Sequence, residues 1–369
     1  MYSRIVMDVD DVISTHRNRD YANAIPNMPV IEKMRELTKQ GIDFVLFTAR
    51  GQISCNGDIE KIEKEKGPIL RTWLKKHEVP YSELRFGKPI GDIYVDDAAM
   101  TPEEFISSEF ISYKGGSNEY IERLGKFVVK ECKSVDSVAI SDWFDAARLY
   151  GYNVPKVYAR TYNKMRMEHI PGIPGNEIKF SSFDNIVLRI ANTIISFAGI
   201  PGEYEFDFGK YEEYVMTNCV DSFSKEYVPI VMDKVFEYRK KIIPSFCHGD
   251  LTTMNTIIND KGIYLIDPIP HNSFSSYLMD IAKLRMSVNG YNDIFYSDEL
   301  INDNALYLQS LDRLLLALNI YDVVIALELS CWIRLIKYRY KEVERYELLK
   351  KRIRKLTEEI YESWWADAK

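Results

Sequence analysis

Short apolar runs alternate with helical segments along the first hundred residues, and two of the three runs end in acidic residues. The runs are 4–9, 42–47 and 92–96, and the segments with helical spacing are 29–41 and 58–77. Strands that alternate with helices favour a parallel sheet with helices on its faces. In such sheets ligands bind at the carboxyl ends of the strands, where acids follow two of these runs. The sequence therefore predicts an α/β fold with a polar site at one sheet edge.

The pattern changes from about residue 110. Residues 110–131 are typical of two or three antiparallel strands around Gly115 and Gly116, and a helical segment at 141–150 and further strand at 155–168 follow. The remainder has mostly helical spacing. We therefore expect a second domain, with strands first and helices after them.

Two patterns near the C-terminus indicate long helices. Residues 314–336 are the most apolar stretch, but Asp322 and Glu328 interrupt it, which favours a buried helix over a membrane span. Residues 336–364 carry apolar side chains every three or four positions, which predicts one amphipathic helix. Its apolar face is interpreted first as packing on its own domain, and a homodimer contact is the alternative.

Charge and cysteine content exclude some function classes. With 48 basic and 55 acidic residues the net charge is −7, which speaks against a general binder of nucleic acid or anionic membranes. The five cysteines are odd in number, far apart and without a CxxC pair. Neither a disulfide framework nor a zinc site is expected, and we predict a cytoplasmic protein.

Three elements predict a first site, in the N-terminal part. Asp8 and Asp10 follow the first run, and residues two apart on an extended segment point the same way. Thr48 follows the second run with a hydroxyl suited to a phosphate oxygen. Lys88 comes next, followed by an acidic cluster: Asp92, Asp96 and Asp97. Carboxylates gathered in this way repel one another unless a cation lies among them, and their hard oxygens suit Mg²⁺.

This order of motifs resembles the haloacid dehalogenase (HAD) phosphatase superfamily, whose signature is DxDx(T/V), a Ser/Thr, a Lys and a closing acidic pair. The resemblance implies an aspartyl-phosphate on Asp8, general acid catalysis by Asp10, and phosphoryl contacts from Thr48 and Lys88. It implies a magnesium site built from Asp8, the Val9 or Asp10 carbonyl, and Asp96 or, as second choice, Asp92, with Asp97 outside the ligand set. The motifs lie close together, so no cap domain is expected, as in small capsule-biosynthesis phosphatases of this superfamily.

The segment His248–Asn255 predicts a second site because its spacing is HxDxxxxN. The same spacing occurs in the kinase catalytic loop, in which the Asp orients the substrate hydroxyl and the Asn holds Mg²⁺. Here these residues are Asp250 and Asn255. The apolar run 263–266 then leads to Asp267, a second candidate magnesium ligand. Phosphoryl transfer depends mainly on positioning and charge neutralisation, which this set supplies.

HGDLxxxN followed by IDP resembles the aminoglycoside phosphotransferase/choline kinase family of small-molecule kinases. The resemblance implies a two-lobed protein-kinase-like α+β domain over 110–369, with an N-lobe at 110–170 and a helical C-lobe at 171–369. The HAD-like Rossmannoid parallel sheet with flanking helices would then occupy 1–109. ATP and Mg²⁺ are the implied cofactors.

The same resemblance assigns nucleotide contacts. Gly115, Gly116 and Ser117 would turn over the ATP phosphates, and Lys130 would reach the α- and β-phosphates, with Lys126 its nearest competitor. Its acidic partner would be Asp142, or Asp145 close behind. The hinge around adenine would include Glu168 and Ile170. Asp280 matches a family position that is structural, and His248 is expected to support the loop.

The acceptor is less constrained by the sequence. Trp332, Tyr338 and Tyr340 are candidates for an aromatic cage around an ammonium group, and Glu328 is a candidate partner for its charge. The first interpretation of most of these aromatic side chains is a position in the core, and the cage is the alternative. Choline, ethanolamine, another amino alcohol or a sugar are the expected acceptor classes.

The leading hypothesis is a bifunctional enzyme that hydrolyses a phosphate ester at the first site and phosphorylates a small alcohol at the second. By resemblance, its pathway would be the synthesis of a capsule or surface polysaccharide. One alternative is a small-molecule kinase with a regulatory, non-catalytic HAD-like domain. Another is an aminoglycoside phosphotransferase, and the last is a pseudo-kinase scaffold.

Overall fold

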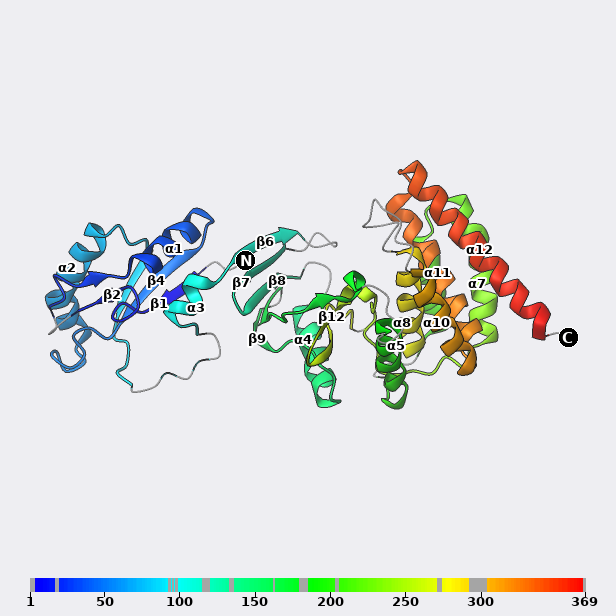
Figure 1. Cartoon of the computed structure of the whole chain (residues 1–369), viewed down its shortest axis with the longest axis horizontal. Coiled ribbons are helices and arrows are strands. Elements are labelled where there is room, and N and C mark those ends of the chain that lie inside the picture. Colours follow the sequence, from blue (N-terminus) through cyan, green and yellow to red (C-terminus); the bar gives the residue numbers. More distant parts are fainter. Residues whose placement is uncertain are drawn as a thin grey trace. The chain divides into compact units, whose positions relative to one another are not determined.

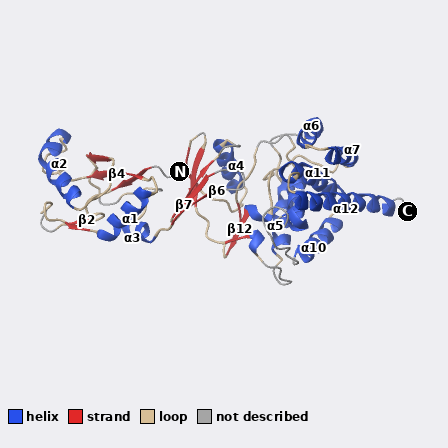
Figure 2. Cartoon of the chain, turned by 90° about the horizontal axis from the view of Figure 1, so that it is seen from above, coloured by secondary structure: helices blue, strands red, loops and turns tan. Residues whose placement is uncertain are grey.

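The computed structural model describes residues 4–16, 20–91, 94, 96, 99–114, 120–132, 136–161, 163–178, 185–202, 206–270, 274–291 and 304–367. The chain divides into two compact units (Figure 1). The first consists of Met1–Ser137 and Lys156–His169, and the second of Val138–Pro155 and Ile170–Lys369. The domain boundary expected between residues 109 and 110 stays a prediction. Figure 2 shows that the first unit holds most of the strands and the second most of the helices.

A three-stranded parallel sheet forms the N-terminal part of the first unit, in the order β1 (Arg4–Met7), β4 (Asp43–Thr48) and β5 (Glu83–Phe86). Helices α1 (Met28–Lys39) and α2 (Ile59–Lys76) connect the strands. The core of this part is apolar because both helices bury one stripe, for example Val30, Ile31, Met34 and Leu37 of α1. Asp58 caps α2 by accepting a hydrogen bond from the Lys61 amide. A small hairpin, β2 (Ser14–Thr15) and β3 (Ile25–Pro26), and helix α3 (Pro102–Ser107) complete this part.

The third strand of this sheet differs from the expected one. It is β5, whereas the apolar run at 92–96 was expected; of that run only residues 94 and 96 are described, and neither lies in a strand. In β5 the charged Glu83 and Arg85 alternate with Leu84 and Phe86. A strand with alternating character is half-buried, and a search for continuous apolar runs does not find it.

A five-stranded antiparallel sheet forms the rest of the first unit. Its strands lie in the order β6-β7-β8-β10-β9. Their bounds are β6 (Phe110–Lys114), β7 (Tyr120–Leu124), β8 (Phe127–Glu131), β9 (Val157–Arg160) and β10 (Lys164–Glu168). The antiparallel strands expected over 110–131 are confirmed as β6, β7 and β8.

The second unit is mainly helical and holds one small antiparallel sheet. That sheet consists of β11 (Ile173–Pro174), β12 (Thr256–Asn259) and β13 (Gly262–Leu265). The helices are α4 (Ser137–Leu149), α5 (Ile186–Ser196), α6 (Phe208–Asn218), α7 (Ser222–Glu237), α8 (Tyr277–Met286), α10 (Asn304–Ala317), α11 (Tyr321–Arg339) and α12 (Val343–Asp367). Short helical turns are η1 (Gly175–Glu177), η2 (Phe197–Gly199), η3 (Thr253–Asn255) and the π-helical η4 (Ser287–Tyr291). Helix α11 is buried along most of its length and packs against α7, α8 and α12, so it forms the centre of this unit.

Both long C-terminal helices are shorter than expected. The apolar stretch 314–336 is divided between α10 and α11 by a turn in which Asn319 has a φ of 55°. The amphipathic stretch 336–364 is divided in the same way, because α11 ends at Arg339 and α12 begins at Val343. The apolar periodicity of the sequence continues across such breaks because each of the separate helices still buries one face. No helix in the part of the chain that the structure describes is long and apolar enough to cross a membrane.

Candidate functional sites

Three predicted side chains of the first site lie at the carboxyl edge of the parallel sheet. Asp8 follows β1, Thr48 ends β4, and Lys88 follows β5 by two residues. The Lys88 amide donates to the Thr48 carbonyl at 3.2 Å, and the Lys88 ammonium group contacts the Asp8 carboxylate. The Val9 amide donates to the other Asp8 oxygen at 2.7 Å. The edge therefore joins a carboxylate to a cation, and a buried hydroxyl lies at the end of the neighbouring strand.

Asp10 is held by Arg50, a residue that the sequence interpretation missed. The Arg50 Nε lies 3.0 Å from each Asp10 oxygen, and its Nη2 lies 2.8 Å from Oδ1. The same Nη2 donates to the Ser14 hydroxyl at 3.0 Å, and the arginine side chain is 1% exposed. Such a bidentate pair neutralises the carboxylate and fixes its orientation. The available signal was the Thr-Ala-Arg sequence in which β4 ends.

The magnesium site expected here stays a prediction, because two of its candidate acids lie outside the described residues. Among the residues that the structure describes, no group of three or more His, Cys, Asp or Glu side chains is arranged to hold a metal ion. Asp8 and Asp10 instead face Lys88 and Arg50. Asp96 lines a cavity of about 620 Å³ together with Asp8 and Lys88. The remaining candidate acids, Asp92 and Asp97, lie outside the described residues.

The second site is built where the loop after residue 247 meets the end of β13. The His248 ring nitrogen Nε2 is 2.8 Å from the Ile266 carbonyl oxygen, and the Ile266 amide donates to the Asn255 carbonyl at 3.0 Å. The Ile269 amide donates to the His248 carbonyl at 2.8 Å. These bonds hold both ends of the HxDxxxxN loop against the segment that carries Asp267. The backbones of all three predicted residues are thereby brought together.

The Asp250 carboxylate has a partner on each oxygen. The Asn255 side-chain amide donates to Oδ2 at 3.2 Å and to the Asp250 carbonyl at 2.6 Å. Lys283, on α8, donates to Oδ1 at 2.9 Å. Burial would raise the pKa of Asp250, but the charge and hydrogen bond of Lys283, together with His248 and Asn255, hold that pKa below its usual value. The carboxylate is thus an ionised, oriented acceptor, and the side chain is 37% exposed.

Two buried groups support this loop from behind. Asp280, also on α8, is fully buried and accepts hydrogen bonds from the His248 amide at 2.6 Å and the Gly249 amide at 2.9 Å. Burial raises the pKa of Asp280 to about 7. Burial also lowers the pKa of His248 to about 4, so the imidazole is neutral. The contacts of both residues are with the loop backbone, which is a structural role.

The oxygen donors of this site fit magnesium. The amide nitrogen of Asn255 is committed to Asp250, which leaves its amide oxygen for another partner. Asp267 adds a carboxylate at the end of the β13 segment, with a φ of 59°. A carboxylate and an amide oxygen are ligands that Mg²⁺ prefers, and bound Mg²⁺ would neutralise the phosphate charges of a nucleotide.

The other predicted nucleotide contacts are distributed as follows. Gly115, Gly116 and Ser117 lie outside the described residues. Lys130 is buried on β8 in the first unit, whereas Asp142 and Asp145 are exposed on α4 in the second, where Asp145 pairs with Arg148 at 2.9 Å. Their pairing with Lys130 stays a prediction. Glu168 ends β10, Ile170 is buried, and the two units divide between His169 and Ile170, inside the expected hinge.

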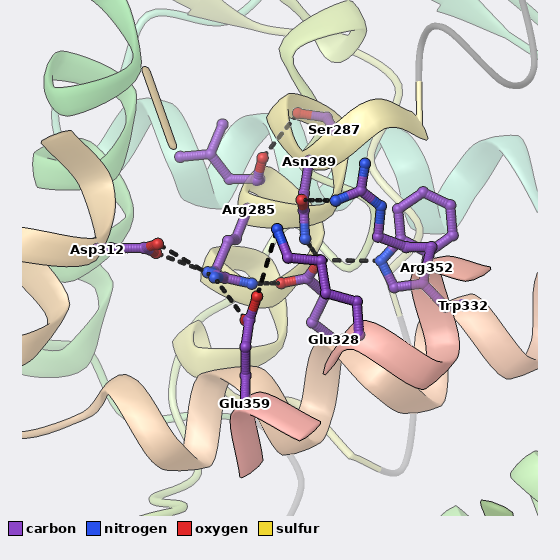
Figure 3. Close-up of polar contacts among 10 residues, drawn as sticks. Arg285, Ser287, Asn289, Asp312, Glu328, Trp332, Arg352 and Glu359 are labelled. Atoms are coloured by element: carbon purple, nitrogen blue, oxygen red, sulfur yellow. Dashed lines mark hydrogen bonds and ion pairs between the residues drawn. The ribbon is translucent and has the colours of Figure 1, made fainter. Parts of the chain in front are cut away.

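The aromatic cage expected for the acceptor is not formed by the residues proposed for it. Glu328 is fully buried, and its carboxylate binds Arg285, Asn289 at 2.8 Å and the Trp332 ring nitrogen at 2.9 Å (Figure 3). Because Glu328 is buried and both of its carboxylate oxygens accept hydrogen bonds, it is not placed to bind a substrate cation. Trp332 is fully buried too, while Tyr338 and Tyr340 are 59% and 45% exposed. These side chains belong to the core and to the surface.

No protein-family model matches the chain, and no curated protein matches it. Among solved structures, a structural-genomics target from Vibrio cholerae is 37% identical over 28% of this chain and 88% of its own, with a TM-score of 0.28. A choline/ethanolamine kinase family protein from Mesorhizobium loti is 13% identical, over 69% of this chain and 90% of its own, with a TM-score of 0.48. A thermostable mutant of an aminoglycoside phosphotransferase is 11% identical, over 70% and 97%, also with a TM-score of 0.48.

Proposed function

We propose that the second unit transfers the γ-phosphate of ATP to the hydroxyl of a small molecule. The observation that carries the proposal is the hydrogen-bonded junction of the His248–Asn255 loop with the end of β13. It unites an oriented carboxylate, Asp250, with two oxygen donors suited to magnesium, Asn255 and Asp267. Phosphoryl transfer needs this combination and little covalent chemistry from the protein.

In this function Asp250 orients the acceptor hydroxyl and receives its proton as the oxygen bonds to the γ-phosphorus. Asn255 and Asp267 would hold Mg²⁺, which neutralises phosphate charge when bound. Asp280 and His248 keep the loop in place. Amino alcohols such as choline and ethanolamine, sugars and aminoglycosides are the acceptor classes to test, and Lys130 with the 115–117 turn would contact the phosphates.

The Asp250→Asn variant tests this function. The amide occupies the same space but does not accept the hydroxyl proton, so we expect at least about a 100-fold loss of transfer from ATP. The measurement offers labelled ATP and Mg²⁺ to a panel of amino alcohols, sugars and aminoglycosides. Binding of Mg·ATP, followed by calorimetry, should change little. Transfer at the wild-type rate in this variant would refute the role of Asp250.

We propose a second function, hydrolysis of a phosphate monoester, for the edge of the parallel sheet. The contact between Lys88 and the Asp8 carboxylate, beside Thr48, favours it. In the HAD-like reaction the carboxylate attacks phosphorus, the alcohol leaves with a proton, and water then hydrolyses the aspartyl-phosphate. Lys88 would hold the phosphoryl oxygens. The bidentate pairing of Asp10 with Arg50 must open before Asp10 acts as the acid.

Hydrolysis of an aryl phosphate by the Asp8→Asn variant tests the second function. Loss of the nucleophile should abolish release of inorganic phosphate, whereas transfer from ATP should stay at the wild-type rate. Asp250→Asn should give the reverse pattern. If wild-type protein hydrolyses no aryl or sugar phosphate, the N-terminal part is better interpreted as a regulatory, non-catalytic module.

A further inference from the structure

Lys283 is a buried lysine, and the cost of burying its charge calls for an explanation. Its side chain is 9% exposed, and its ammonium group donates to Asp250 Oδ1 at 2.9 Å and to the Gly249 carbonyl. Burying an ammonium ion costs free energy unless it is fully paired. The charge of Asp250 raises the pKa of Lys283 despite burial, so the group stays charged. If this position served only the stability of the core, an apolar side chain would be at least as favourable as a buried ion pair.

The backbone amides of the loop are held without this lysine, although its ammonium group also donates to the Gly249 carbonyl. Asp280, one turn earlier on α8, already accepts hydrogen bonds from the amides of His248 and Gly249. The Lys283 contact with Oδ1 therefore acts mainly on the carboxylate itself. It complements Asn255, which binds Oδ2, so that the carboxylate is held from both sides.

We propose that Lys283 is the positioning residue of the phosphotransfer site. Its ammonium group holds Asp250 in one orientation, so that the exposed part of the carboxylate meets the acceptor hydroxyl. This inference rests on the proposed phosphotransfer. In that step the hydroxyl oxygen bonds to the γ-phosphorus, the bond to ADP breaks, and the proton passes to Asp250. Correct placement of such a group lowers the activation barrier because less orientational freedom has to be given up on reaching the transition state.

Three variants test the proposal. Lys283→Met keeps the length of the side chain and removes the charge and the donors. Lys283→Arg keeps both in a different geometry. Lys234→Met is the matched control, because Lys234 is 11% exposed and pairs with Glu237 at 2.8 Å on α7, outside the site. The probes are transfer from Mg·ATP to the panel of acceptors and release of inorganic phosphate from Mg·ATP to water.

We expect Lys283→Met to lower kcat by at least about 30-fold, a fraction of the full contribution of a general base. KM for ATP should change less than about threefold, since the lysine acts through Asp250 rather than on bound nucleotide. Lys283→Arg should recover part of kcat, and Lys234→Met should match the wild type. A kcat within threefold of wild type in Lys283→Met would overturn the proposal. So would a loss confined to KM.

A stability measurement separates this inference from the proposed function. If wild-type protein neither binds nor uses ATP, the proposed phosphotransfer fails and this inference fails with it. If wild-type protein transfers phosphate, chemical denaturation of the Lys283→Met/Asp250→Asn double variant tests the inference alone. A pair kept for positioning predicts a double variant at least as stable as wild type, because both charges are gone. A markedly less stable double variant would assign the pair to folding and overturn the inference.

Discussion

The hydrogen bonds of the buried His248 ring depend on its protonation state. The ring is fully buried, and its Nδ1 accepts a hydrogen bond from the Asp250 amide at 3.3 Å. Because Nδ1 is the acceptor, Nε2 carries the proton that is donated to the Ile266 carbonyl. A second proton on Nδ1 would break the bond to the Asp250 amide and place a charge in a buried position, where desolvation disfavours it.

The protonation of His248 predicts a pH dependence of stability. Its folded pKa of about 4 lies below the ordinary value of 6.5, so the unfolded chain binds more protons between these values. The histidine therefore stabilises the fold above pH 6.5, and this contribution, of order 3 kcal/mol, is lost as the pH falls toward 4. In His248→Gln, urea denaturation should show a correspondingly smaller loss over this range. Parallel curves for wild type and variant would contradict this expectation.

Residues inside contiguous motifs could be predicted from the sequence, and residues that reach a site from elsewhere could not. Asp8 stands next to a strand end and Asp250 lies within a fixed motif spacing, and a single sequence displays both features. Arg50 and Lys283 contact those sites only after helices and strands have packed. Glu328 was assigned a binding role that it does not have. Its position one turn from Trp332 suggested a partner for a substrate cation, but the sequence did not show that Arg285 forms an ion pair with it.

At the scale of elements, Arg285 joins four helices of the second unit. From α8 it contacts Asp312 on α10 at 2.7 Å, Glu328 on α11, and Glu359 on α12 at 3.5 Å (Figure 3). Its side chain is 1% exposed. Removing one partner from a buried charge network leaves the others uncompensated, and the cost exceeds that of an exposed pair.

We therefore expect Arg285→Met to lower the free energy of unfolding by about 3–5 kcal/mol. Lys210→Met is the control, since Lys210 and Asp207 form an exposed pair at 3.8 Å and should contribute less than about 1 kcal/mol. Equilibrium denaturation in urea measures both. A loss below 1 kcal/mol in Arg285→Met would mean that helix packing holds these elements without the network.

Helices and strands with clear periodicity were predictable, and their ends were less so. Segments 29–41 and 58–77 correspond to α1 and α2 within two residues at each end. The breaks at 318–320 and 340–342 were missed because the apolar pattern continues across them. Strand β5 was missed because its alternating charges resemble a surface loop.

At the scale of the whole molecule, the groups that carry the two proposed reactions belong to different compact units. Asp8, Thr48 and Lys88 belong to the first unit, and Asp250 and Lys283 to the second. The contacts described for each of these two sets are made within its own unit, which is why the Asp8→Asn and Asp250→Asn variants should affect separate reactions. The change of sequence pattern near residue 110 indicated a second kind of fold. It did not indicate that α4 belongs to the helical unit.

The cysteines offer an experimental consequence at this scale. All five cysteines are buried and form no disulfide, and burial raises the pKa of Cys247 to about 12 and of Cys331 to about 11. Protonated, shielded thiols react slowly with maleimides. A cysteine introduced on the surface of each unit would therefore accept a fluorophore ahead of the native five. Energy transfer between two such dyes would then report the separation of the units during turnover, in an otherwise natural chain.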